Sequence, residues 1–444
     1  MNRAVNHAFH RGMAAVYAMA FASFYSQIPG LVGEHGIEPY GAFFKAVHDR
    51  FGGRGYYLLP SLAWLHPTSG FLQLISALGM VIAIFAAFSA AEGVISHLTF
   101  AALWVLWLSV VNAGGVFTSF QWDVLLLEAG FLAIFYSPLL VRWLLFRLMF
   151  LSGAVKLLSK DPTWRNWTAL DVHYQTQPIP NAIAWYMHNA PHWFGRLSLG
   201  FMWTVELAVP FLIFAPRRAR QACGAILIAF QLILIATGNY AFFNWLTIVL
   251  CLALFEEDAG RWKEPVCIAM ATILVPISLL EMASRFDVTV HDGGLIQLVS
   301  PFHVVNSYGL FAVMTTTRPE IVIEGTADGV TWKPYEFRYK PGDMHRRPPF
   351  VAPHQPRLDW QMWFAALGGS YNNRWFSRLM VRLLEGQPEV LGLLESNPFL
   401  DHPPKAVRAT LYEYRFTGPG ARDWWTRELK GPYFPEVSLP KSKP

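Results

Sequence analysis

Charged residues are scarce in this chain. Asp, Glu, Lys and Arg together make up 15% of its 444 residues, whereas a soluble globular protein carries about 25%. Hydrophobic residues reach 54%, with 34 Phe and 18 Trp. This composition excludes an ordinary soluble domain and is typical of a polytopic membrane protein, with the lipid bilayer as a partner. The net charge of +5 fits a positive-inside bias and does not indicate nucleic-acid binding.

Cysteine and recognisable catalytic motifs are also lacking. The three cysteines, Cys223, Cys251 and Cys267, all lie in apolar runs, so we expect small buried side chains and no disulfide framework. The chain has no P-loop, no dinucleotide-binding fingerprint and no nucleophile elbow. His188 and His192 have a metal-like spacing only in a continuous helix, which Pro191 disfavours. We therefore predict no metal site and no cofactor.

Apolar runs dominate the first two thirds of the chain. Each is long enough, or nearly long enough, to cross a bilayer, and the first lacks a cleavage site and is read as a retained span. After Arg285 the content of charge, Pro and Gly rises and no further run follows. We predict a transmembrane domain over 1–284 with about nine spans and a separate domain over 285–444. The nine runs cover residues 12–28, 71–90, 97–114, 122–140, 143–158, 199–215, 219–237, 240–255 and 265–283.

The C-terminal third predicts a small α+β domain. Two segments of alternating hydrophobicity, 320–324 and 333–339, flank Asp328-Gly329, which is typical of a β-hairpin. Residues 407–416 alternate again and predict a third strand. Two amphipathic segments predict short helices, at 358–367 and 374–385.

The basic residues predict an orientation. With a cytoplasmic N-terminus, nine spans place the loops of 30–70 and 159–198 and the whole C-terminal domain on the exoplasmic side. The turns at 114–121 and 238–240, which would face the same side, carry no Lys or Arg, as the positive-inside rule requires. The two long loops depart from this bias, but long loops weigh less in the rule. Their basic residues are Lys45, Arg50, Arg54, Lys160, Arg165 and Arg196. The basic residues assigned to cytoplasmic loops are Arg142, Arg217, Arg218, Arg220, Arg261 and Lys263.

Two carboxylates interrupt the apolar run that begins at residue 122. Asp123 and Glu128 each cost roughly 2.5 to 3.5 kcal/mol at membrane depth, so we expect basic partners. If the next span returns through a turn near 140–143, Lys156 lies level with Glu128 and Lys160 with Asp123. We therefore predict a structural Glu128–Lys156 ion pair, and a contact of Asp123 with Lys160 or water. Glu206 in a later span is read as a contact within the bundle.

Two segments are rich in aromatic, Arg and His side chains. The first, 159–178, is read either as an aromatic belt at the membrane surface or as a recognition surface over the mouth of the bundle. The second, 353–364, is read either as a client-gripping cluster, because Trp and Arg dominate protein interfaces, or as a helix that docks the C-terminal domain onto the bundle. The residues expected to contact a client are Trp164, Trp167, His173, His354, Gln355, Arg357, Asp359, Trp360 and Trp363.

Several blocks of this sequence resemble the lipase maturation factor family over nearly the whole length. The longest read Ser-Phe-Gln-Trp-Asp-Val-Leu-Leu-Leu-Glu-Ala-Gly-Phe at 119–131 and Pro-His-Gln-Pro-Arg-Leu-Asp-Trp-Gln-Met-Trp at 353–363. Shorter blocks lie at 27–36, 152–156, 162–164, 173–178, 238–244 and 306–311.

The resemblance implies an integral membrane chaperone-like factor that helps secreted lipases reach their active, assembled form. It implies that the segment from about Asn306 onward contacts the client and faces the lumen. The membrane is that of the endoplasmic reticulum in a eukaryote and the inner membrane in a bacterium. A lipase-like secreted protein is thus the expected partner.

A shorter pattern, Gly153-Ala-Val-Lys156-Leu followed by Trp164, is similar to that of vitamin K-dependent carboxylase and related transmembrane proteins. This resemblance implies that Lys156 is a base acting on a lipid-soluble cofactor or substrate. The alternative function is therefore a membrane enzyme with a deep pocket lined by Lys156, Glu128 and Asp123. A lysine firmly paired with a carboxylate stays protonated and is a poor base, so the two interpretations of Lys156 compete.

Overall fold

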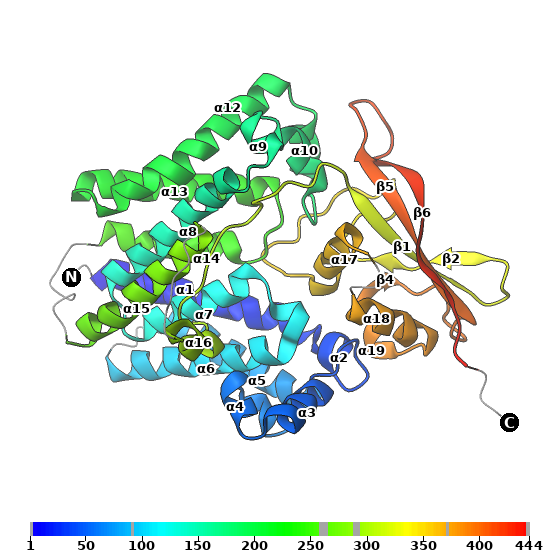
Figure 1. Ribbon diagram of the computed structural model, residues 1–444, viewed down its shortest axis with the longest axis horizontal. Coiled ribbons are helices and arrows are strands. Elements are labelled where there is room, and N and C mark those ends of the chain that lie inside the picture. Colours follow the sequence, from blue (N-terminus) through cyan, green and yellow to red (C-terminus); the bar gives the residue numbers. More distant parts are fainter. Residues whose placement is uncertain (1–2, 90–92, 257–264, 287–293, 370–372, 441–444) are drawn as a thin grey trace.

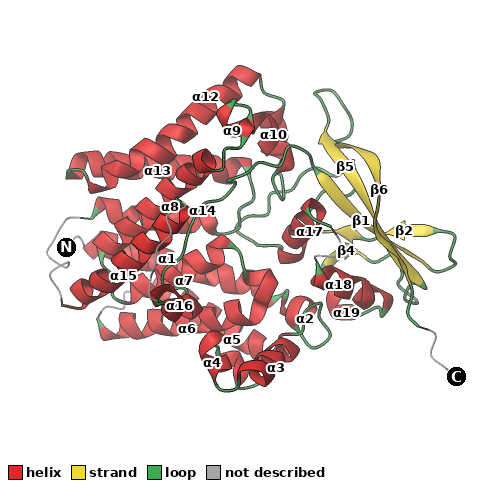
Figure 2. Ribbon diagram, in the orientation of Figure 1, coloured by secondary structure: helices red, strands yellow, loops and turns green. Residues whose placement is uncertain are grey.

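A helical bundle and an α+β domain lie end to end in the computed structural model of the chain (Figure 1). The structure describes residues 3–89, 93–256, 265–286, 294–369 and 373–440. The marked N-terminus lies at the end of the bundle remote from the β-sheet, and the helices of the bundle run roughly along the line that joins the two parts (Figure 2). The predicted class, a polytopic helical protein with a C-terminal α+β domain, is confirmed.

All nine predicted apolar runs form helix. In chain order the main helices are α1 (Arg3–Tyr25), α5 (Ser69–Phe88), α6 (Val94–Gly114), α7 (Gln121–Ile134), α8 (Pro138–Leu158), α12 (His192–Trp203), α13 (Arg217–Thr237), α14 (Phe243–Cys251) and α15 (Pro265–Arg285). A π-turn, η3 (Thr204–Ala208), and a 3-10 turn, η4 (Val209–Phe214), extend α12, and η5 (Leu252–Phe255) extends α14. Six helices of the described chain are long and apolar enough to cross a membrane: α5, α6 with its extension, α8, α12 with its extensions, α13 and α15.

The central helices of the bundle are those that carry the buried charges. In α7, Asp123 and Glu128 are as buried as the leucines around them, and α8 is the most buried of the six long spans. The outer helices differ, because α5 exposes large apolar side chains such as Leu74, Phe85 and Phe88. This division indicates that α7 and α8 contact protein and that α5 contacts lipid. The three cysteines are buried, as predicted.

Short helices cover one end of the bundle. Between α1 and α5 lie α2 (Ile28–Val32), α3 (Tyr40–Phe51), α4 (Arg54–Leu58) and η1 (Leu62–Trp64). Between α8 and α12 lie α9 (Pro162–Arg165), α10 (Ala169–Thr176) and α11 (Ala182–His188). A 3-10 turn, η2 (Gly115–Thr118), joins α6 to α7, and α16 (Leu295–Val299) follows α15.

A four-stranded antiparallel sheet forms the centre of the α+β domain. Its strand order is β2-β1-β5-β6, with β1 at Pro319–Thr326, β2 at Trp332–Pro334, β5 at Ala406–Phe416 and β6 at Trp425–Val437. A two-stranded sheet pairs β3 (Glu336–Phe337) with β4 (Leu394–Ser396). The helices α17 (Arg357–Leu367) and α18 (Arg374–Leu384) lie between the sheet and the bundle, with α19 (Pro388–Leu391) beside them (Figure 1).

The predicted hairpin, third strand and two helices of this domain occur, but the predicted strand at 333–339 is divided. Its first part, β2, pairs with β1, and its second part, β3, pairs with β4 in the smaller sheet. Gly329 adopts a φ of 84° in the β1–β2 turn, where glycine avoids a Cβ clash. The Asp328 carboxylate accepts the backbone N–H groups of Val330 and Thr331 at 2.8 and 2.7 Å, which fixes the turn. The strand β5 and both amphipathic helices occur as expected. The strand β6 was not predicted, because Pro432 and Pro435 interrupt its pattern and proline is tolerated only at a sheet edge or bulge.

Candidate functional site

The predicted site residues gather at the junction of the bundle and the α+β domain. Asp123 of α7 and Arg357 of α17 form a bidentate ion pair there, with both nitrogen–oxygen distances at 2.8 Å. Both side chains are fully buried. The Arg357 guanidinium also donates to the Phe117 carbonyl and lies over the rings of Phe24 and Phe120. The expectation that Asp123 contacts Lys160 is wrong, because its partner comes from the other domain.

Glu128 accepts four donors. Arg147 of α8 forms an ion pair with one carboxylate oxygen. The other oxygen accepts the Asn306 backbone N–H at 2.9 Å, the Asn306 side chain at 3.0 Å and the Tyr308 hydroxyl at 2.6 Å. Asn306 and Tyr308 belong to the segment that leads from the membrane domain to the sheet. Glu128 therefore holds this segment against α7 as well as neutralising Arg147.

The predicted Glu128–Lys156 pair is wrong for a geometric reason. The helix α7 ends at Ile134 and α8 begins at Pro138, so the reversal lies about one and a half turns earlier than expected. Residues at equal depth then sum to about 272 rather than 283, which brings Arg147 within one turn of Glu128. Lys156 lies nine residues, about two and a half turns, beyond Arg147 and is therefore out of reach of Glu128.

Lys156 pairs with Glu206 instead. Its ammonium donates to both carboxylate oxygens of Glu206, at 2.9 and 2.6 Å, and lies 5.5 Å from the Trp164 ring centroid. Glu206 sits in the π-turn η3, and a Cβ added at Gly153 would lie 3.0 Å from the Glu206 Cβ. The absence of a side chain at residue 153 thus permits the close approach on which this pair depends. Glu206 is a contact within the bundle, as expected.

A neutral hydrogen-bonded cluster surrounds this pair. The Tyr240 hydroxyl lies 3.1 Å from His173 Nε2 and donates to the Gln177 side chain at 2.9 Å. Burial and the nearby Lys156 charge lower the pKa of His173 to about 4, so the imidazole is neutral at pH 7. Trp164 donates its ring N–H to the Phe311 carbonyl at 3.2 Å. The loop of 159–178 is therefore bonded to the segment that leads into the sheet domain.

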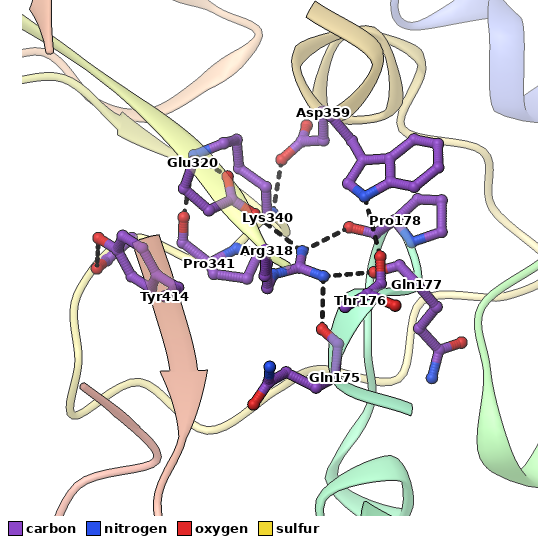
Figure 3. Close-up of polar contacts among 12 residues, drawn as sticks. Gln175, Thr176, Gln177, Pro178, Arg318, Glu320, Lys340, Pro341, Asp359 and Tyr414 are labelled. Atoms are coloured by element: carbon purple, nitrogen blue, oxygen red, sulfur yellow. Dashed lines mark hydrogen bonds and ion pairs between the residues drawn. The ribbon is translucent and has the colours of Figure 1, made fainter. Parts of the chain in front are cut away.

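Arg318 is a second connection between the domains, and no pattern in the sequence predicted it. Its guanidinium donates to the carbonyls of Gln175 at 2.8 Å, Gln177, and Pro178 at 2.9 Å, at the end of α10 (Figure 3). The same guanidinium forms an ion pair with Glu320 at 2.8 Å. Burial lowers the pKa of Arg318, and the Glu320 carboxylate opposes that effect. An Arg just before a predicted strand was the only available signal.

Lys340 and Asp359 complete this buried charged cluster. Lys340 pairs with Glu320 at 2.9 Å and donates its backbone N–H to Asp359 at 2.8 Å. Burial raises the pKa of Asp359, and the backbone N–H groups of Lys340 and Tyr339 oppose the rise. Figure 3 shows Glu320 between Arg318 and Lys340, with Asp359 beside Lys340. The carboxylates thus hold two cations in place where the sheet meets α10.

The block of 353–363 docks the α+β domain onto the bundle, the second of the two interpretations given above. The Gln355 backbone N–H donates to the Ser23 hydroxyl at 2.8 Å, and its carbonyl accepts the Gln27 side chain at 2.8 Å. Trp360 packs edge-on against Trp122, with ring centroids 4.9 Å apart. Trp363 donates its ring N–H to the Thr176 carbonyl at 3.0 Å.

The residues expected to contact a client differ in exposure. Trp167 is 45% exposed and stands on the outer surface of the loop between α9 and α10. The others are buried or half-buried at the junction: Trp164, His173, His354, Gln355, Arg357, Asp359, Trp360 and Trp363. Client contact through these side chains would require the two domains to separate.

The three candidates for enzyme chemistry do not share a pocket. Asp123, Glu128 and Lys156 each face a separate partner, and these partners are Arg357, Arg147 and Glu206. Within the described part of the chain, no group of three or more His, Cys, Asp or Glu side chains could hold a metal ion. These charges therefore neutralise one another, between the domains at Asp123 and within the bundle at Glu128 and Lys156.

Comparison with known proteins identifies the family. The model of the lipase maturation factor transmembrane domain matches residues 4–262, and that of the lipase maturation factor C-terminal domain matches residues 304–435. The chain belongs to the lipase maturation factor family. The junction described above lies between the two matched domains of that family, and the resemblance inferred from the sequence blocks is confirmed.

Vertebrate members of the family align with nearly the whole chain. Lipase maturation factor 1 of Bos taurus is 35% identical over 493 residues, which cover 96% of this chain and 88% of the relative. Lipase maturation factor 1 of Homo sapiens is 35% identical over 508 residues, 98% of this chain and 88% of the relative. Lipase maturation factor 2 of Gallus gallus is 35% identical over 584 residues, 97% of this chain and 81% of the relative. No solved structure matches the chain.

Proposed function

We propose that this chain is an integral membrane maturation factor that assists the folding and assembly of secreted lipase-like proteins. The names of its relatives indicate the class of client. The observation that carries the proposal is the buried contact that holds the α+β domain against the bundle. Two fully buried side chains, Asp123 and Arg357, join that domain to the helix α7 of the bundle. A domain bound through buried contacts to the end of a membrane bundle is suited to receive a client that is still close to the membrane.

We further propose nine membrane crossings, with the domain boundary at about residue 285. The six long spans alone would return the chain to its starting side, whereas the marked N-terminus and the sheet lie at opposite ends of the bundle (Figure 1). The helices α1, α7 and α14 supply three more crossings. The 14 residues of α7 span only about 21 Å, which suffices because protein, and not lipid, surrounds this helix.

The distribution of basic residues supports a cytoplasmic N-terminus and an exoplasmic sheet domain. Arg142 and Arg220 both donate to the Glu256 carbonyl, at the end of the bundle where Arg217 and Arg218 also lie. Positive charge gathers on the cytoplasmic side of membrane proteins. Arg261 and Lys263, assigned to the same side from the sequence, lie outside the described residues.

The surface proposed to contact the client is the open face of the sheet near β1, β2 and β5, together with Trp167. On this face the Arg408 guanidinium lies 4.0 Å from the Trp332 ring centroid, and Arg427 lies 4.6 Å from that of Tyr412. Stacked Arg and aromatic side chains are the residue types that dominate protein interfaces. The Arg408 side chain is 40% exposed, so a client can reach it without separation of the domains.

Site-specific photocross-linking tests the proposed surface. A photoreactive amino acid replaces Tyr412 in one variant and the exposed Leu400 in a matched control, in membranes where a secreted lipase is being synthesised. We expect the lipase to be trapped at residue 412 and not at residue 400. Equal trapping at both positions, or none at residue 412, would overturn the assignment of this face.

A further inference from the structure

A helical pair beside the bundle carries exposed aromatic and basic side chains that the maturation role leaves unused. It consists of α3 and α4 with the turn η1, residues 40–64. Its exposed large apolar residues are Phe43, Phe51, Tyr56, Tyr57 and Leu62, and Leu65 follows directly. Figure 1 shows α3 and α4 at the outer side of α5, toward the end of the bundle that faces the sheet.

Hydrogen bonds fix the depth of this pair relative to the spans. The Leu62 N–H donates to the Ser109 hydroxyl at 2.9 Å, and the Asn112 side chain donates to the Pro60 carbonyl at 2.8 Å. Ser109 lies five residues before Gly114, where α6 ends, which is about 7.5 Å along the helix axis. Interfacial helices bury their apolar face about 5–10 Å into the boundary between headgroups and acyl chains. The pair is therefore fixed near the end of α6 that leads into η2, and we place it at the level of the headgroups.

The start of α3 is anchored at the same level. The Tyr40 hydroxyl donates to the carbonyls of His66 and Thr68, at 3.1 and 2.9 Å, directly before α5 begins at Ser69. Trp64 stacks on Phe44 with ring centroids 4.3 Å apart, and Tyr56 meets Trp64 edge-on at 4.9 Å. Aromatic clusters of this kind are typical of the membrane–water interface.

The helical pair of α3 and α4 carries a positive net charge. Between residues 40 and 64 the basic side chains are Lys45, Arg50 and Arg54, and the single acidic one is Asp49. Asp49 is already paired with Lys45 at 2.8 Å. Arg50 and Arg54 are exposed and lie next to the aromatic side chains. Guanidinium groups beside interfacial aromatics are complementary to lipid phosphates.

We propose that α3, α4 and η1 form a membrane-interface site that binds the headgroup of an anionic phospholipid through Arg50 and Arg54. The apolar side chains enter the bilayer boundary, and the two guanidinium groups take the phosphate. The occupant is the bilayer, because the apolar surface continues onto the lipid-facing side of α5, where Leu74 and Leu78 are exposed. The inference does not depend on the identity of the client.

Depth-dependent quenching tests the position of the pair. The full chain is placed in nanodiscs with a fluorophore on a new cysteine, since all three native cysteines are buried. Phe43→Cys and Phe51→Cys are compared with Val330→Cys and Leu400→Cys, which replace exposed residues of the α+β domain. A nitroxide near the headgroup of phosphatidylcholine is expected to quench the first two labels and spare the last two. Equal quenching at all four positions would overturn the proposal and leave this face open to a protein partner.

Native mass spectrometry tests the headgroup preference. The full chain in detergent is titrated with phosphatidylglycerol or phosphatidylcholine, and the double variant Arg50→Ala/Arg54→Ala is compared with Arg415→Ala/Arg422→Ala. The control removes the same charge from exposed positions of the α+β domain. We expect the affinity for phosphatidylglycerol to fall about fivefold for each arginine removed from the helical pair. The control variant should bind phosphatidylglycerol as the wild-type chain does. An equal loss in both variants, or no loss, would contradict the assignment of the arginines.

Discussion

Replacing Arg357 by methionine removes one partner of the buried ion pair and leaves Asp123 charged in a fully buried site. Asp123 is fully buried and loses two charge-assisted hydrogen bonds of 2.8 Å. Breaking a buried pair in this way typically costs about 3–5 kcal/mol. We therefore expect the free energy of unfolding of Arg357→Met to fall by roughly this amount.

The double variant Asp123→Asn/Arg357→Met is the informative comparison. It removes the stranded carboxylate charge, although the Phe117 carbonyl still loses its guanidinium donor. An unsatisfied buried group costs about 1–3 kcal/mol, so the double variant should be more stable than Arg357→Met alone. Denaturant unfolding in detergent, followed by tryptophan fluorescence, measures both differences.

An exposed pair provides the control. Lys45 and Asp49 form an ion pair with side chains 76% and 59% exposed, and such helix pairs contribute about 0.3–0.5 kcal/mol. Lys45→Met should therefore leave stability nearly unchanged. If Arg357→Met is equally harmless, or if the double variant is less stable than Arg357→Met, the pair does not hold the domains together.

Three further variants test other parts of the junction. Tyr308→Phe removes a 2.6 Å hydrogen bond to Glu128 and should cost about 1.5–3 kcal/mol of unfolding free energy, measured as above. Lys156→Met should impair lipase maturation, because it destabilises the bundle. Adding Glu206→Gln should restore lipase maturation. A double variant that is stable but inactive would instead support a catalytic Lys156. Burial, with Arg357 and Arg338, lowers the pKa of His354 to about 4. The unfolded chain takes up this proton near pH 6.5 and the folded chain does not, so stability should fall by up to about 1.4 kcal/mol per unit as the pH drops from 6.5 to 4. His354→Gln should flatten that slope, and an unchanged slope would rule out His354 as its source.

The elements of the fold that the sequence predicted are those governed by local pattern. Continuous apolar runs predicted the bundle, and Asp328-Gly329 between alternating segments predicted the hairpin. The strand β6 was missed because its prolines are tolerated only at an edge, and being at an edge is a property of the assembled sheet. Local sequence pattern therefore predicts where helices and strands form better than it predicts which of them lie side by side.

The sequence pattern alone could not identify the partners of the buried charges. The need for a partner at Asp123 and Glu128 followed from the cost of a buried charge. The choice of Arg147 followed from the position of one turn, and an error of about one and a half helical turns in that position selected Lys156 instead. Arg357 lies 234 residues from Asp123, and only the docking of the α+β domain brings the two together.

The specific activity of a secreted lipase tests the central claim most directly. The lipase is produced in cells that lack this chain, in cells that express it, and in cells that express Arg408→Ala/Arg427→Ala, and activity is divided by the mass of lipase secreted. We predict high specific activity only with the wild-type chain, and a reduced value with the variant although the variant is folded and present in the membrane. Equal specific activity with and without the chain, for every secreted lipase-like protein of the same cell, would contradict the account.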